Sequence, residues 1–379
     1  MKILHLSDLH LGKRVNEFSM IEDQDYILKE ILKIIDQEQI ETIIIAGDIY
    51  DKPVPPAEAV ELFDDFLVQL SSRRLHVFVI SGNHDSAERI AFGGRLMDQS
   101  GIHVSPVYNG SIVPIKLNDA YGDISFYMLP FIKPVHVRRY YPETLIETYT
   151  DAMRVVIQNM HVNTSKRNIL ISHQFVTGSL RSDSEDITVG GTDNVDSSVF
   201  EGFDYVALGH IHRAQKCGRE FIRYCGTPLK YSFSEANDHK TVTIVDFQEK
   251  GNIKLSYVPL TPKRDLVEIK GTYNEIIQKS FYENTNYPED YVHITLTDEE
   301  DIPEVMSKLR VVYKNVMKLD YDNSRTRSDC EVQGADTQNK KTPMEYFEDF
   351  YELQNGMEMI EEQKKYMNHL IEEIWEGKR

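Results

Sequence analysis

His210 and His212 raise the question of metal binding in this sequence of 379 residues. They follow an apolar run with the pattern of a β-strand, in the segment VALGHIHRAQ at residues 206–215. Residues i and i+2 of an extended chain point to the same side and stand about 6.6 Å apart. That separation suits two metal ions better than one, although a chain with 13 histidines also produces such a pair by chance. Further ligands must decide between the two interpretations.

Candidate ligands also follow four other apolar runs that have the pattern of strands. Side chains at the carboxyl ends of strands in an open α/β sheet gather in one crevice, so five strand ends would deliver their groups to one site. Imidazole, carboxylate and amide groups without thiolate suit Mn, Fe or Zn, and the sequence does not choose among these metals. The residues are Asp8 and His10 in SDLH, Asp48 in AGD, Asn83, His84 and Asp85 in SGNHD, and His173 in ISH.

A glycine stands directly before a candidate ligand at three of these strand ends. Such glycines predict tight turns from strand to loop, at places where a side chain would crowd the metals. The pairs are Gly47 and Asp48, Gly82 and Asn83, and Gly209 and His210.

The elements that position these residues alternate between strand and helix over the first 260 residues or so. A helical pattern spans residues 22–38, and the later part of this stretch has more β character. We therefore predict an α/β unit over residues 1–264, with two packed mixed sheets flanked by helices. The predicted strands are residues 2–7, 42–47, 75–82, 168–173, 205–210 and 241–247.

A second, smaller unit is predicted over residues 265–321. Its pattern is that of an α+β domain, with a helix opened by the capping box Thr272 to Glu275 and a second helix near residues 303–310. Strands are expected at residues 265–270, 291–297 and 315–322. Residues 322–341 are polar and lack periodicity, which indicates a linker.

Two amphipathic helices are predicted in residues 342–379. Thr342, Pro343 and Glu345 supply an N-cap, a proline at the first helical position and a capping-box acid, and Asn355-Gly356 ends the first helix. A second helix is expected at residues 357–376. The pair either packs on its own domains or docks on a partner, and we favour a partner. The apolar positions are Phe347, Phe350, Tyr351, Ile360, Met367, Leu370, Ile371 and Ile374.

Composition narrows the classes of function. A formal net charge of -19 argues against an overall basic nucleic-acid binder, although a groove that holds divalent metals is locally positive. The three cysteines lack a C-x-x-C spacing, so neither a disulfide framework nor a zinc-thiolate site is indicated. Charge and histidine in the first ten residues, and the lack of any run of eighteen apolar residues, predict a cytoplasmic protein without a membrane segment.

The order of the motifs D-x-H, GD, GNHD, a lone H and GHxH resembles the calcineurin-like metallophosphoesterase family. The segments DLHLGKR, SGNHDSAERIAFG and GTPLKYSFSE resemble the SbcD-type nucleases of that family. This likeness covers roughly residues 1–265 in sequence and the rest of the chain in layout. It implies a four-layer sandwich, a small α+β capping domain and a C-terminal helix pair.

The resemblance also implies a site for two divalent metal ions, which we expect to be Mn²⁺. Asp48 would bridge the ions, because a carboxylate offers two oxygens and a charge. His84 would act on the phosphate, and Asp51 would orient the His84 imidazole. One metal would be held by Asp8, His10, Asp48 and His212, and the other by Asp48, Asn83, His173 and His210.

Three cations are candidate DNA contacts. Lys13 and Arg14 directly follow the first metal loop, where the alternative is solvated surface, and Arg89 lies in SGNHDSAERIAFG.

The function implied is that of a Mn-dependent phosphodiesterase with two DNA activities, a 3'-5' exonuclease on double strands and an endonuclease on single strands and hairpins. It would serve repair and recombination at the nucleoid, as a homodimer in a heterotetramer with an SbcC-type ATPase. A cyclic-nucleotide phosphodiesterase or a protein phosphatase is the first alternative, but neither needs the additions after residue 265. A non-catalytic scaffold of the same fold is the second alternative, and it predicts missing ligands, whereas every expected position is filled.

Overall fold

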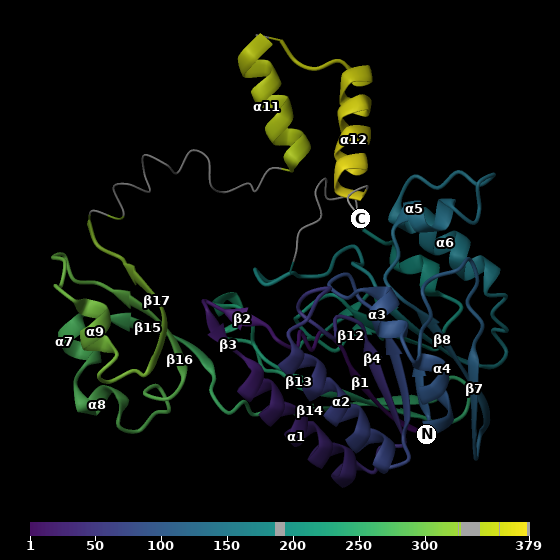
Figure 1. Cartoon of the computed structure of the whole chain (residues 1–379), viewed down its shortest axis with the longest axis horizontal. Coiled ribbons are helices and arrows are strands. Elements are labelled where there is room, and N and C mark those ends of the chain that lie inside the picture. Colours follow the sequence, from purple (N-terminus) through teal and green to yellow (C-terminus); the bar gives the residue numbers. More distant parts are fainter. Residues whose placement is uncertain (186–193, 325, 327–341, 356, 377–379) are drawn as a thin grey trace.

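The first unit of the computed structural model contains two six-stranded mixed sheets (Figure 1). The model describes residues 1–185, 194–324, 326, 342–355 and 357–376. Within the first sheet, β1 is parallel to β4 and antiparallel to β13. Its order is β14 (Ile253–Pro259), β13 (Thr241–Phe247), β1 (Lys2–Leu6), β4 (Thr42–Ala46), β5 (His76–Ile80) and β6 (Ile102–Val104). The second sheet has the order β11 (Gln215–Cys217), β12 (Arg219–Tyr224), β10 (Tyr205–Gly209), β9 (Arg167–His173), β8 (Gly122–Leu129) and β7 (Ile115–Asp119).

The two sheets pack face to face and helices cover their outer faces. Phe78 of the first sheet stacks on Phe126 of the second with ring centroids 4.2 Å apart. Helices α1 (Ile21–Glu38) and α2 (Ala57–Ser72) share one core with the outer side of the first sheet, and α6 (Tyr149–Asn159) shares another with the outer side of the second. The predicted four-layer sandwich is confirmed. Short elements complete the unit: β2 (Arg14–Val15), β3 (Phe18–Ser19), α3 (Ala87–Ala91), α4 (Gly94–Met97), α5 (Pro134–Arg138) and the 3-10 turns Asp98–Ser100, Ser197–Phe200 and Phe233–Glu235.

The strands predicted in the first unit are those that are mostly buried on both faces. β4 and β9 are buried along their whole length, and their centres carry the apolar runs III and ILI. The strands that the sequence analysis did not predict include β7 and β14, whose residues alternate between half-buried and exposed positions. β8 was also missed, although its apolar run at residues 124–129 would have indicated it. The centre of each sheet is thus easier to predict than its edges.

The second unit is a sheet of three parallel strands with helices between them. Thr272 and Glu275 form the predicted capping box at the start of α7, with the Glu275 carboxylate 2.7 Å from the Thr272 hydroxyl. Both strand pairs of this sheet are parallel, which the sequence analysis did not predict. Helices connect each strand to the next. The elements are β15 (Leu266–Gly271), α7 (Tyr273–Ile276), α8 (Lys279–Tyr282), β16 (Tyr291–Leu296), α9 (Val305–Leu309) and β17 (Asn315–Tyr321).

The carboxylate of Asp23 joins the two units. Asp23 lies in the first turn of α1 and is fully buried. Arg264 donates two hydrogen bonds to it, of 3.1 and 2.7 Å, and the Tyr291 hydroxyl of β16 donates a third of 2.8 Å. The guanidinium of Arg264 also lies over the Tyr291 ring. These three hydrogen bonds and the Arg264 charge offset the loss of hydration of the buried carboxylate.

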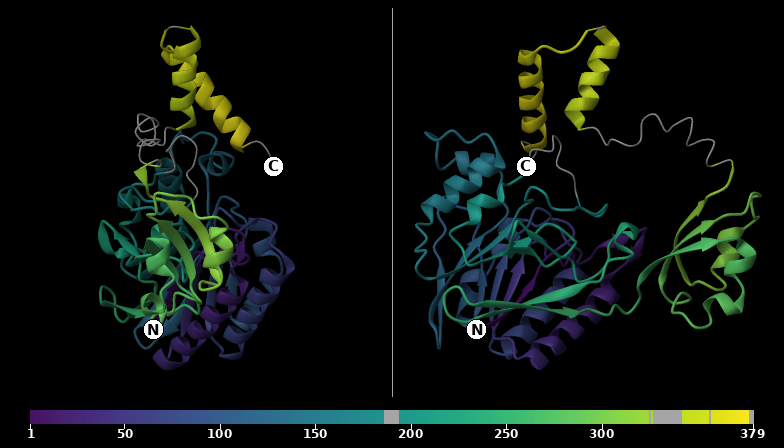
Figure 2. Two further views of the ribbon diagram at one scale, coloured as in Figure 1. Left: turned by 90° about the vertical axis from the view of Figure 1, so that its left-hand side faces the viewer. Right: turned by 180° about the vertical axis from the view of Figure 1, so that it is seen from behind.

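The C-terminal part forms a helix pair at one end of the molecule in all views of Figures 1 and 2. The first helix is α11 (Pro343–Asn355), and the Thr342 to Glu345 capping box is confirmed. The second, α12 (Glu361–Glu376), begins four residues later than predicted. Gln363 and Lys364 of α12 bind Tyr351 and Glu348 of α11, at 3.0 Å each. Most of the predicted linker, residues 327–341, and the side chain of Ile374 lie outside the described residues.

Several large apolar side chains of this pair face solvent. Phe350 is 57% exposed and Ile360 is 59% exposed. Among the described residues, the structure contains no helix with the length and hydropathy that spanning a membrane requires.

We predict that Arg264→Ala lowers the free energy of unfolding by about 2–4 kcal/mol, because it leaves the buried Asp23 carboxylate without its charged partner. Lys263→Ala is the matched control, since Lys263 pairs with the exposed Glu22 at 3.5 Å, and it should cost less than about 1 kcal/mol. Urea unfolding followed by circular dichroism measures both. Equal midpoints for the two variants would show that Asp23 does not depend on Arg264.

Candidate metal centre

The seven predicted ligand residues meet at one edge of the sandwich. Strands β1, β4 and β5 are parallel neighbours in the first sheet, and β9 and β10 are parallel neighbours in the second. Their carboxyl ends therefore lie together, as predicted for an open α/β sheet. The convergence of five strand ends that the sequence suggested is confirmed by the fold.

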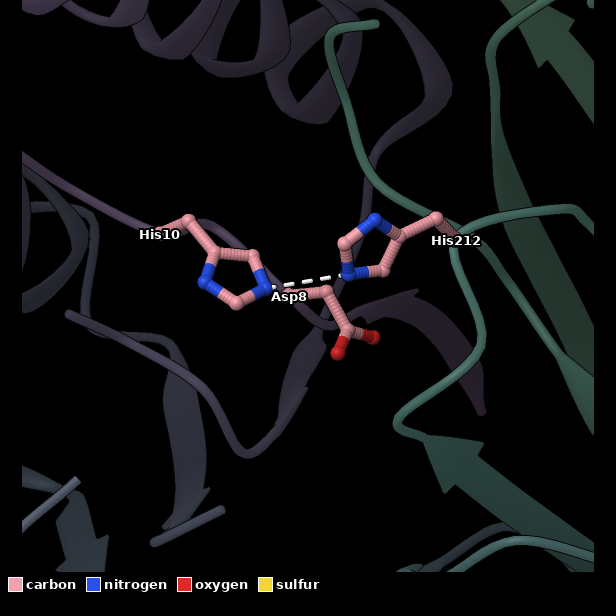
Figure 3. Close-up of side chains that lie close together, drawn as sticks. All are labelled: Asp8, His10 and His212. Atoms are coloured by element: carbon pink, nitrogen blue, oxygen red, sulfur yellow. Dashed lines mark hydrogen bonds between the residues drawn. The ribbon is translucent and has the colours of Figure 1, made fainter. Parts of the chain in front are cut away.

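The first group of candidate ligands is Asp8, His10 and His212 (Figure 3). Each offers a ligand atom, and these atoms all lie within 4.8 Å of one another. The two imidazoles point their Nε2 atoms at each other, 3.1 Å apart. The Asp8 carboxylate accepts hydrogen bonds from the Ser7 hydroxyl and from the main-chain N–H of His210, the latter at 3.0 Å.

The second group surrounds Asn83. Its Oδ1 lies 2.9 Å from His173 Nε2 and 2.9 Å from His210 Nδ1. Asp48 Oδ2 lies 3.2 Å from His173 Nε2 and 3.8 Å from His10 Nε2 of the first group. Asp48 is therefore the carboxylate between the two groups, which is the position expected of a bridging ligand.

The arrangement fits a cation because atoms that accept hydrogen bonds face one another. His173 Nδ1 donates to the carbonyl oxygen of Ala46 at 2.8 Å, so in the neutral ring Nε2 carries a lone pair. That lone pair faces the oxygens of Asn83 and Asp48, and buried acceptors repel one another unless positive charge lies between them. In the metal-free chain a proton on Nε2 satisfies this requirement, and a divalent ion bound by the same atoms would satisfy it as well.

Burial and charge set the pKa values in the cluster. Burial lowers the pKa of His10 and of His210 well below the ordinary value, so these rings are neutral, as metal ligands must be. Burial also lowers the pKa of His173, but the charge and hydrogen bond of Asp48, the Asp8 charge and the Ala46 carbonyl together outweigh it and raise that pKa to about 9. Burial raises the pKa of Asp8 to about 6. Burial disfavours the Asp48 carboxylate too, but His173, His84 and His10 together outweigh this and hold the pKa of Asp48 well below the usual range.

The backbone is strained where it carries these ligands. Asp8, His10, Asp48 and His210 have φ values of 55°, 45°, 48° and 105°, in the region that L-residues avoid. Such conformations cost on the order of 1–3 kcal/mol each and persist where the surrounding structure holds them. A Cβ at Gly82 would lie 2.1 Å from Asp48 Oδ1, and one at Gly209 would lie 2.0 Å from the Ala46 carbonyl oxygen. A side chain at either glycine would therefore overlap a candidate ligand or the neighbouring main chain.

Comparison with known proteins agrees with this geometry. A family model described as calcineurin-like phosphoesterase matches residues 1–214, and one described as type 5 capsule protein repressor C-terminal domain matches residues 262–355. The SbcD subunit of the nuclease SbcCD from Staphylococcus epidermidis is 34% identical over 98% of both chains, and that from Staphylococcus saprophyticus is 31% identical over 99% of both. This chain belongs to the SbcD nuclease family.

Among solved structures, a dimetal phosphatase from Danio rerio covers 69% of this chain and 96% of its own at 12% identity, with a TM-score of 0.43. Membership of the SbcD family rests on the sequence relatives and the family models. It makes the chain a phosphodiester hydrolase that uses divalent metal ions.

In this member of the SbcD family, His84 is the most open histidine of the centre. Its side chain is 17% exposed, whereas those of His10 and His173 are fully buried. Its main-chain N–H donates to Asp48 Oδ1 at 2.9 Å, and its Nε2 lies 4.0 Å from Asp48 Oδ2. His84 is therefore held beside the ligands while its ring remains reachable from solvent.

Asp51 contacts the His84 ring through its main chain. His84 Nδ1 lies 3.1 Å from the main-chain carbonyl oxygen of Asp51. The Asp51 carboxylate instead pairs with Lys13 at 2.7 Å and lies 3.7 Å from His10 Nδ1. The contact between Asp51 and the His84 ring thus exists through the main chain, where it does not depend on the residue type.

Asp85 has a structural role that the sequence analysis did not assign. It is buried, and its carboxylate accepts hydrogen bonds from the main-chain N–H groups of Gly82, Ile49 and Tyr50 at 2.9 to 3.1 Å. It therefore ties the loop after β4 to the loop after β5, which carry Asp48 and Asn83. In the sequence, only the position of Asp85 two residues after the candidate ligand Asn83 pointed to this structural role.

The three predicted DNA contacts lie in different settings. Lys13 is paired with Asp51 and lies over the Tyr231 ring, so it belongs to the framework of the centre. Arg14 lines a cavity of about 570 Å³ between the two units. Arg89 is exposed on α3.

We predict that metal affinity rises with pH between about 6 and 9. His173, with a pKa of about 9, holds a proton below that pH, and a metal ion must displace it. Asp8, with a pKa of about 6, adds a second competing proton only at lower pH. Calorimetric titration of Mn²⁺ in buffers of different ionisation enthalpy should show release of about one proton at pH 7.5. An affinity that does not change over this range would contradict the proposed ligand role of His173.

Proposed function

We propose that this chain is the nuclease subunit of an SbcC–SbcD type complex that cleaves DNA in repair and recombination. The observation that carries the proposal is the cluster of Asp48 and six other side chains with nitrogen and oxygen donors, with the more open His84 beside it. The relatives share the name of the SbcD subunit of the nuclease SbcCD, which supports this function over a cyclic-nucleotide phosphodiesterase or a protein phosphatase. The complete ligand set argues against a non-catalytic scaffold.

The chain would hold two divalent ions, with Mn²⁺ as the expected metal. A site of imidazole, carboxylate and amide oxygens suits such ions, and Asp48 is placed to contact both. Two bound ions would supply an activated water and neutralise charge on the phosphate. We assign the metals the ligand sets given by the family resemblance: Asp8, His10, Asp48 and His212 for one, and Asp48, Asn83, His173 and His210 for the other.

His84 would act on the substrate itself. Its ring is reachable from solvent, its Nδ1 faces the Asp51 carbonyl oxygen, and its Nε2 remains directed toward the metal side at 4.0 Å from Asp48. A hydrogen bond from Nδ1 to that carbonyl fixes the ring and leaves Nε2 to hold or move a proton at a phosphate oxygen. Asp51 would support this through its main chain.

DNA would reach the centre along the cavity between the two units. This cavity of about 570 Å³ is lined by Arg14 of the first unit, by His293 and Lys318 of the second, and by Ser184, which contacts His212. Arg14 and Lys318 would neutralise phosphates here, although Asp183 and Glu268 also line the cavity and the chain as a whole carries a net charge of -19. The substrates we expect are double-strand ends, cut 3'-5', and single strands or hairpins, cut internally. A location at the nucleoid would follow from these substrates.

We predict that His84→Gln lowers the rate of DNA cleavage by roughly 10² to 10⁴ while both ions stay bound, since the residue acts in proton transfer. Asp48→Ala should lose both ions and all activity, because both groups of ligands share that carboxylate. The assay is cleavage of labelled duplex and hairpin DNA with Mn²⁺, Mg²⁺ or a chelator, with metal content measured on the same samples. Wild-type turnover in His84→Gln would show that the histidine has no chemical role.

The helix pair would bind the ATPase partner. Phe350 and Ile360 expose more than half of their surface, and apolar residues at helical spacing are the anchors of helix-in-groove docking. Phe92 and Leu96, at 85% and 79% exposure, are candidates for a second apolar surface, which would join two copies of this chain. The assembly would then be a heterotetramer of two nuclease and two ATPase chains.

Removal of residues 342–379 should abolish stable association with the SbcC-type partner while Mn-dependent cleavage of single strands persists. Phe350→Asp should weaken the complex strongly, since it places a charge on an apolar contact, and Glu352→Lys on the same helix should have little effect. Size-exclusion chromatography of the two subunits mixed together measures this. A truncated chain that still binds with full affinity, or that no longer folds, would refute the partner role of the helix pair.

A further inference from the structure

A chain of hydrogen-bonded polar groups lies behind His212, on the side away from His10. The Ser184 hydroxyl is 2.6 Å from His212 Nδ1 and 2.5 Å from Glu235 Oε1. Glu235 Oε2 is in turn 2.5 Å from Lys240 Nζ. Glu235 is fully buried and Lys240 is 9% exposed, whereas Ser184 is half-buried and lines the cavity between the two units.

The direction of each hydrogen bond in this chain follows from what the groups can donate. Glu235 is paired with an ammonium group and accepts hydrogen bonds only. Ser184 has one hydroxyl proton, and a bond of 2.5 Å to a carboxylate requires that proton to point at Glu235. The Ser184 oxygen must then accept from His212, so the proton of the neutral His212 ring sits on Nδ1. Its Nε2 is left with the lone pair that faces the centre.

The same groups also hold the main chain of His212. Lys240 Nζ donates to the His212 carbonyl oxygen at 2.9 Å and to the Thr227 hydroxyl at 2.8 Å, so all three of its protons are used. The Glu185 carboxylate accepts from the His212 N–H at 2.7 Å. Ring and backbone of this one histidine are thus fixed by residues from two distant loops.

We propose that Ser184 and Glu235 are positioning residues, which fix His212 as the tautomer with Nδ1–H so that its Nε2 can bind a metal. The inference rests on the ligand role of His212 in the proposed function. Outer partners of this kind set the orientation and basicity of a metal-binding imidazole, and their loss costs about 10- to 100-fold in metal affinity. Neither residue touches the metal position itself.

The proposal distinguishes variants of similar size. Ser184→Ala removes the acceptor of Nδ1–H, whereas Ser184→Thr keeps a hydroxyl there. Glu235→Gln introduces an amide N–H that can donate to Ser184, which would turn the Ser184 proton toward His212 and favour the wrong tautomer. Ser234→Ala is the matched control, because the Ser234 hydroxyl accepts from the Asp183 N–H at 3.0 Å and so anchors the same loop without touching His212.

Calorimetric titration with Mn²⁺ is the first test. Ser184→Ala and Glu235→Gln should weaken one of the two ions about 10- to 100-fold, Ser184→Thr should restore its affinity, and Ser234→Ala should bind both ions as the wild type does. Wild-type affinity in Ser184→Ala, or equal losses in Ser184→Ala and Ser234→Ala, would overturn the proposal. If Glu235→Gln does not fold because it leaves Lys240 without its anion, the Ser184 variants decide.

The tautomer is read directly by nitrogen-15 NMR of the metal-free full chain labelled at histidine, with His212→Ala used to assign the signal. A proton on Nδ1 in the wild type and on Nε2 in Glu235→Gln supports the inference, and a proton on Nε2 in the wild type overturns it. His212→Ala also distinguishes a failure of the proposed metal site from a failure of the positioning role. If it still binds both ions normally, the proposed metal site is wrong, whereas if it loses one ion and Ser184→Ala does not, only the positioning role is wrong.

Discussion

The structure of the centre depends on the need for positive charge among buried groups that repel one another. The oxygens of Asn83 and Asp48 face the Nε2 of His173 within 3.2 Å, and the bond from His173 to the Ala46 carbonyl prevents the ring from resolving this by changing tautomer. The fold therefore holds acceptors where a proton on His173 Nε2 or a bound cation has to lie between them. Holding these acceptors in place requires strained backbone, since several ligands have left-handed φ values. It also requires glycines at positions where an added Cβ would overlap neighbouring atoms.

Several residues that are not themselves candidate ligands maintain this arrangement. Asp85 ties the loops after β4 and β5 together through three main-chain N–H groups. Ser184 and Glu235 fix the ring of His212, which follows a strand of the second sheet, through hydrogen bonds. Asp23 joins the second unit to α1, and so fixes the cavity through which a strand would approach. A negatively charged chain with metal ions at its centre can then be attractive to DNA locally while repelling it elsewhere.

The sequence could predict the four layers and the convergence of the ligands, because buried parallel strands have continuously apolar sequences and their ligands follow at once. It could not predict that the Asp51 carboxylate turns to Lys13, since Asp51 is adjacent to both Lys13 and His84 only in three dimensions. Glu235 lies 51 residues from Ser184 in the chain, and no spacing marks such a pair. Edge strands such as β7 were missed because half their residues face solvent.

The central claim is that two divalent ions share the Asp48 carboxylate, and anomalous X-ray diffraction from crystals grown with Mn²⁺ tests it most directly. The account predicts two anomalous peaks about 3.5–4 Å apart. One should be surrounded by Asp8, His10 and His212, the other by Asn83, His173 and His210, with Asp48 between them. A single peak, or a pair of peaks that leaves Asp48 outside both coordination spheres, would contradict it.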